Sequence, residues 1–145
     1  MSVDEAHTRP SGTSDATVAA VGKLSEAFEV IEDARGQLYN VHRKIGMADL
    51  ALGDAVGLLR DAGHDALAEQ IETELLGRNV LAGRWTFQVI EEFDDGYYAT
   101  FRDYERRARD ELMGGKRHVH EAQMKQDRRS PGVPGHEATP EDAGC

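Results

Sequence analysis

A run of apolar residues spaced by alternating steps of four and three constrains the fold of this chain more than any other feature. The run occupies thirteen successive positions: Ala20, Leu24, Ala27, Ile31, Ala34, Leu38, Val41, Ile45, Ala48, Leu52, Ala55, Leu59 and Ala62. We call these positions the heptad stripe. This spacing keeps side chains on one face of an α-helix, whereas a β-strand requires alternation at every second residue. The heptad stripe therefore predicts a helical scaffold with an apolar edge that must be covered.

The heptad stripe consists of two columns that differ in side-chain size. The large-residue column is Leu24, Ile31, Leu38, Ile45, Leu52 and Leu59. The alanine column is Ala20, Ala27, Ala34, Val41, Ala48, Ala55 and Ala62, with Val41 as its one larger member. Small side chains allow another helix backbone to approach closely. We therefore expect a partner helix to lie against the alanine column.

Glycines outside the heptad stripe leave its continuity open. Each glycine inside a helix costs about 1 kcal/mol relative to alanine. Gly46, followed by Asp49 as a helix cap, would divide the segment into a helical hairpin. The alternative is a single kinked helix of about 43 residues, roughly 64 Å long.

Three further helices are expected after the heptad stripe, with glycines at their ends. Gly63 ends the first helical region, and a short helix then presents Leu67, Ile71 and Leu75 before it stops at Gly77. A long helix is expected from about Trp85 to Met113. Its predicted apolar side carries Val89, Ile90, Phe93, Tyr97, Phe101, Tyr104, Ala108 and Leu112. Its predicted solvent side carries Glu91, Asp95, Tyr98 and Arg102.

The ends of the chain differ in composition from its middle. All four prolines lie in residues 1–14 and 130–145, which are poor in large apolar side chains, so we expect both segments to be disordered tails. Residues 15–113 are predicted to form an all-α antiparallel bundle of three to four main helices. Residues 114–129 are predicted to form a basic amphipathic helix that packs weakly.

Charge and cysteine content narrow the function. The net charge of -10 disfavours nucleic acids and anionic membranes as partners. No apolar run is long enough for a membrane span, and the first residues lack a signal peptide pattern, so we expect a cytoplasmic protein. Cys145 is the only cysteine, which excludes an internal disulfide and a thiolate metal cage. No cofactor is predicted.

Seven of the nine aromatic residues lie between Trp85 and Tyr104. Aromatic and arginine side chains are enriched at the centres of protein interfaces. The candidate partner-binding residues are therefore Trp85, Tyr97, Tyr98, Phe101 and Arg102. Because the heptad stripe is longer than the remaining helices can cover, we expect a homodimer or a helical protein partner, and hence an interaction or regulatory module without catalysis of its own.

A second hypothesis is a metal-dependent enzyme. Glu69-x-x-Glu72 is followed by Glu91-x-x-Asp94, and four carboxylates suit Mg²⁺ or another divalent metal. This pair of motifs resembles the E-x-x-E and E-x-x-D motifs of all-α nucleoside triphosphate pyrophosphohydrolases. The resemblance covers these four residues and implies Mg²⁺-assisted attack of water on a triphosphate. In that case Arg84 or Arg102 would contact the phosphates of a phosphorylated small molecule.

Overall fold

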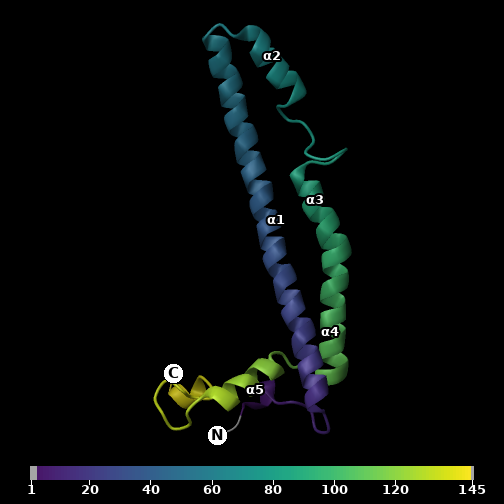
Figure 1. Ribbon diagram of the computed structural model, residues 1–145, viewed down its shortest axis with the longest axis vertical. Helices are drawn as coiled ribbons and strands as arrows, with labels where there is room; N and C mark the ends of the chain where they lie inside the picture. The colour runs from purple at the N-terminus through teal and green to yellow at the C-terminus, as the bar shows by residue number, and fades with distance from the viewer. Residues whose placement is uncertain (1–2, 145) are drawn as a thin grey trace. The chain divides into compact units, whose positions relative to one another are not determined.

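The computed structural model describes residues 3–144, and within this range it is all-α, as the sequence predicts (Figure 1). The α-helices are α1 (Asp15–Asp61), α2 (Asp65–Glu74), α3 (Thr86–Phe93), α4 (Ala99–Met113) and α5 (Val119–Arg128). The π-helical segment η2 (Asp94–Tyr98) joins α3 to α4, and single 3₁₀ turns η1 (Glu5–His7) and η3 (Glu141–Ala143) lie in the two predicted tails. No helix within residues 3–144 has the length and apolar character required to cross a bilayer.

Helix α1 is continuous through the heptad stripe from Ala20 to Leu59, and Ala62 lies in the turn that follows. Gly46 lies inside the helix, so the hairpin alternative is wrong and the single-helix alternative holds. The helix ends near Gly63, as the sequence predicts. Gly63 adopts a left-handed conformation, with φ 88°. There the amide of Gly63 donates to the carbonyl of Arg60 (2.9 Å) and the amide of His64 donates to the carbonyl of Leu59 (2.8 Å). These two bonds satisfy the last carbonyl groups of α1.

The chain divides into two compact units that both include part of α1. We call Met1–Val30 with Thr100–Cys145 the terminal unit, and Ile31–Ala99 the central unit. Each unit has its own buried residues and its own long-range hydrogen bonds, and each is described separately below.

In the terminal unit, α4 lies antiparallel to the first part of α1. The hydroxyl of Ser25 donates to Glu105 Oε1 (2.9 Å), and the ring of Phe28 stacks on Phe101 with centroids 6.0 Å apart. Higher residue numbers on α1 therefore meet lower numbers on α4. A small core closes this unit, and its members are Val18, Val21, Met113 and Val119.

Helix α5 packs more firmly than the sequence suggested. Its first residue, Val119, belongs to the core of the terminal unit, and His120 lies directly against Gly22 of α1. A Cβ atom at position 22 would lie 2.7 Å from the Cβ of His120, so the contact depends on the absence of a side chain there. The expectation of weak packing was wrong because it considered the apolar face of this helix alone and not the close approach that Gly22 permits.

In the central unit, α2 and α3 lie along the second part of α1, again in antiparallel order. Arg35 contacts Asp94, His42 contacts Thr86, and Asp49 accepts a hydrogen bond from the amide of Gly77 (2.9 Å). The buried residues of this unit are Val56, Ala68, Thr86, Ile90 and Tyr98.

The segment Thr86–Met113 is helical throughout, close to the predicted 85–113, and it ends at Gly114 and Gly115, which both have positive φ. Within it, η2 was not predicted and changes which side chains face inward. A π-turn holds one more residue than an α-turn, so positions beyond it shift around the helix axis. Tyr98, predicted to face solvent, is only 8% exposed, whereas Tyr97, predicted to lie on the apolar side, is 59% exposed.

The contact between Gly22 and His120 yields a prediction. Gly22→Ala should destabilise the protein, because its new methyl group meets the Cβ and Cγ atoms of His120 and forces α5 to move. Gly36→Ala is the matched control, since it lies in the same helix with open space around it and should stabilise by about 1 kcal/mol. Urea unfolding followed by circular dichroism measures both. Equal stabilisation by the two substitutions would contradict the packing of α5 on Gly22.

Candidate interaction surface

One side of the central unit is closed by a polar cluster around Arg35. Arg35 Nε donates to Asp94 Oδ1 (2.8 Å), and Arg35 Nη2 donates to Asp94 Oδ2 (3.0 Å). The guanidinium also lies over the rings of Tyr98 (4.5 Å) and Tyr39 (5.3 Å). The hydroxyl of Tyr98 donates to Glu32. The hydrogen bonds to Asp94 raise the pKa of Arg35 above its usual value, and burial opposes that rise only in part.

These contacts identify the face that α1 turns towards its partners in the central unit. Arg35, His42 and Asp49 follow one another at intervals of seven, and each bonds to α3, η2 or the segment after α2. Val56, the next residue in this series, is 3% exposed. The large-residue column of the heptad stripe borders this face, and the alanine column lies about 100° around the helix from it.

The alanine column is consequently open to solvent except at Ala55, which is half-buried. Ala34, Val41 and Ala48 are all exposed, and Val41 retains 48% of its accessible surface. Leu38, Ile45, Leu52 and Leu59 of the large-residue column are half-buried. The expectation that another helix covers the alanine column is therefore wrong for the described part of the single chain. The intramolecular contact is made instead by another face of α1, which contains charged and polar side chains. The apolar pattern gave no indication of this face.

Two adjoining hollows lie beside the exposed column, and together we call them the apolar groove. The smaller hollow has a volume of about 260 Å³ and is lined by Leu38, Val41, His42, Ile45, Val80, Leu81, Thr86 and Val89. The larger has a volume of about 970 Å³ and is lined by Ile45, Ala48, Asp49, Leu52, Leu75, Arg78, Asn79, Val80, Leu81, Ala82, Gly83 and Trp85. Ile45, Val80 and Leu81 line both hollows.

The smaller hollow is apolar except for two polar groups that bond to each other. His42 Nδ1 lies 2.7 Å from Thr86 Oγ1. This pairing satisfies both groups, so the smaller hollow offers hydrocarbon surface more than hydrogen-bonding capacity. Val41 of α1 and Val89 of α3 line the same hollow, which places apolar side chains of both helices on one side of the central unit.

The five predicted partner-binding residues are placed differently from one another. Trp85 is half-buried, lines the larger hollow, and begins α3 with its amide donating to Gln88 Oε1 (2.7 Å). Tyr97 and Arg102 are exposed. Tyr98 and Phe101 instead pack within the chain, against Arg35 and Phe28 respectively. Trp85 and Tyr97 thus offer more accessible aromatic surface than Tyr98 does.

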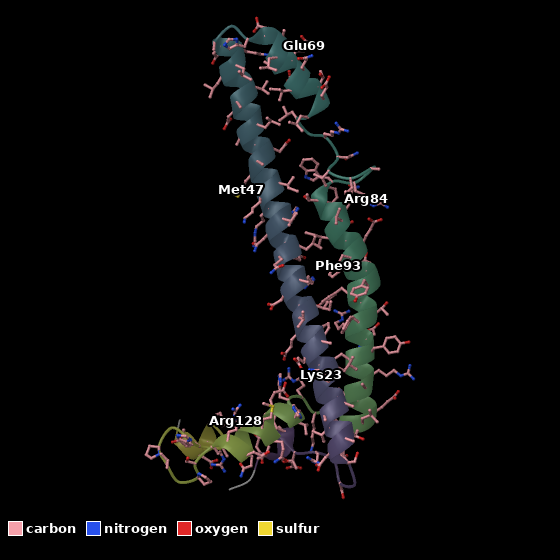
Figure 2. All side chains as sticks on the ribbon, in the orientation of Figure 1. Lys23, Met47, Glu69, Arg84, Phe93 and Arg128 are labelled. Atoms are coloured by element: carbon pink, nitrogen blue, oxygen red, sulfur yellow. The ribbon has the colours of Figure 1, made fainter. Side chains whose placement is uncertain are left out.

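The four predicted metal ligands all belong to the central unit, and Glu69 points outward from α2 (Figure 2). Glu72 is ion-paired with Arg60, and Asp94 with Arg35. Within the described chain, no three of these four carboxylates bring their oxygen atoms within 4.8 Å of one another. Arg84, considered for phosphate binding, forms an ion pair with Glu92 that lowers the pKa of that carboxyl group. This placement gives no support to a shared metal ion.

Sequence reasoning missed the residues that hold the central unit together. Arg35 was not singled out, although it lies seven residues after Phe28 and seven before His42, in a column that runs parallel to the heptad stripe. That spacing was the available signal. The wall of the groove formed by residues 78–85 had no periodic signal.

Comparisons with known proteins add no assignment: no protein-family model, no curated protein and no solved structure matches the chain.

The Arg35–Asp94 pair provides a second prediction. In a double-mutant cycle of Arg35→Gln and Asp94→Asn, the coupling free energy should be about 1 kcal/mol, because the bidentate pair is partly shielded from solvent and the guanidinium also contacts two rings. The exposed pair Arg107–Glu111, measured in the same way, should show a smaller coupling. Urea unfolding provides the free energies. Additive effects at Arg35 and Asp94 would contradict the contact.

Proposed function

We propose that this chain is a non-catalytic helical interaction module, acting in the cytoplasm, that self-associates through the alanine column and the apolar groove of its central unit. The exposure of Val41 beside half-buried Leu38 and Ile45 is the observation that carries the proposal. Covering this surface would remove further hydrocarbon from water, at about 25 cal/mol for each Å² buried.

A second copy is the occupant that the pattern fits best. In a two-fold symmetric interface the same surface meets itself, so it must be complementary to itself. Parallel columns of large and small residues have this property, because the large-residue column of one copy can lie over the alanine column of the other. The heptad spacing supplies such pairs along the central part of α1, from Ala34 and Leu38 to Ala55 and Leu59.

Charge favours the same surface. The chain carries a net charge of -10, which opposes association through most faces. In the central unit, the alanine column and the smaller hollow contain no aspartate, glutamate, lysine or arginine. Two copies can therefore meet along the alanine column and the smaller hollow without bringing formal charges into direct contact, whereas the larger hollow adds Asp49 and Arg78, one charge of each sign.

The proposal predicts that Val41→Glu dissociates the assembly. A carboxylate buried in an apolar interface without a partner should weaken association by at least about 100-fold, equivalent to about 3 kcal/mol. Val41 is already 48% exposed, so the substitution should leave the single chain folded. Light scattering coupled to size-exclusion chromatography, at about 100 µM protein, detects dimers with dissociation constants in the micromolar range.

Leu50→Glu is the matched control. Leu50 belongs to the same helix, is 75% exposed and lies outside the heptad stripe, so this variant adds the same charge away from the proposed interface. We expect the wild type and Leu50→Glu to be dimers and Val41→Glu to be a monomer with an unchanged circular dichroism spectrum. A monomeric wild type, or two variants that associate equally, would overturn the proposal.

A further inference from the structure

A second set of side chains, in the terminal unit, has the composition of a transition-metal site. Glu29 of α1 meets His118 and Glu121 at the start of α5. One ligand atom from each residue lies within 4.8 Å of the others, and all three residues are exposed. Both helices belong to the terminal unit, so the group lies within one compact part of the chain.

The spacing within this group suits an ion between the ligands. His118 Nδ1 and Glu121 Oε1 are 3.6 Å apart. Two atoms bound to Zn²⁺ at about 2.0–2.1 Å and separated by a tetrahedral angle lie about 3.4 Å from each other. Small rotations of exposed side chains can therefore bring these atoms into coordinating positions.

The electrostatics of this group also favour a cation. Two carboxylates come together from helices that are distant in sequence, and within residues 3–144 neither forms a salt bridge with lysine or arginine. A divalent cation bound between the two carboxylates would neutralise their negative charge. An imidazole beside two carboxylates selects zinc-like ions over Mg²⁺ and Ca²⁺, which prefer oxygen ligands alone.

We propose that Glu29, His118 and Glu121 bind one divalent transition-metal ion of the Zn²⁺ type. Three protein ligands leave a position for water, so the site is of the open kind. The ion links the first part of α1 to α5, and it stabilises the fold of the terminal unit because it binds the folded state. This site is independent of self-association through the central unit.

Titration of the full-length chain, without an affinity tag, with Zn²⁺ and with Co²⁺ tests the proposal. Calorimetry should show one ion per chain, and Co²⁺ should give a visible absorption band from nitrogen and oxygen ligands. His118→Asn and Glu29→Gln should each weaken binding by roughly tenfold or more. Asparagine is chosen at position 118 because His118 has φ 55°, a left-handed conformation that asparagine tolerates.

Three controls keep the outcome decisive. Cys145→Ser, which removes the only thiol, and His64→Asn, which removes another exposed imidazole, should bind as the wild type does. The His118→Asn variant should retain the wild-type circular dichroism spectrum and melting temperature in the presence of a chelator, which shows that it folds. A wild type that binds neither ion, or a His118→Asn variant that binds equally well, would overturn the proposal.

Discussion

The structure depends on how little of helix α1 its partners can cover. In the central unit, α3, η2 and the segment after α2 contact the face that carries Arg35, His42 and Asp49, and Val56 of the same series is buried. A neighbouring helix contacts only part of the circumference of another, and the apolar arc of α1 is wider than that part. The heptad stripe therefore extends beyond the contact. Its large-residue column is half-buried, and its alanine column is exposed except at Ala55. The proposed self-association would cover the part of this apolar arc that the other helices of the chain leave exposed.

The polar cluster around Arg35 and the smaller hollow around Val41 differ in chemistry, although both belong to the central unit. In the polar cluster, Arg35 forms two hydrogen bonds with Asp94, and Tyr98 donates one to Glu32. Such polar contacts contribute modestly to stability, yet they favour one register of α1 against η2, because a shift of one residue would separate the charges. The smaller hollow has only two polar residues, which bond to each other, so a helix placed against it would be held mainly by shape and hydrocarbon burial.

Much of the fold could be predicted from the sequence because glycines end its helices. The ends near Gly63 and Gly114, and the long helix after Trp85, follow from local pattern alone. The packed face of α1 could not be predicted in this way, since its polar members make sense only beside partners that lie 28 to 59 residues away in sequence. The contact of Gly22 with His120 is hidden for the same reason. For the candidate surface, the apolar column itself could be predicted, whereas its exposure in the single chain and the groove wall formed by residues 78–85 could not.

The π-helical segment η2 has a consequence for how this protein can change over evolutionary time. A π-helical turn holds one extra residue, so the chain can change in length by one residue here while the residue pattern of α4 stays the same. Gly96 sits within this turn, with open space around the position of a side chain. Deletion of one residue from η2 would return the segment to α-helical spacing and change the position of Tyr98 relative to Arg35. The length of this one turn therefore sets the contact between the arginine cluster and the helix that follows, while α3 and α4 keep their own residue patterns.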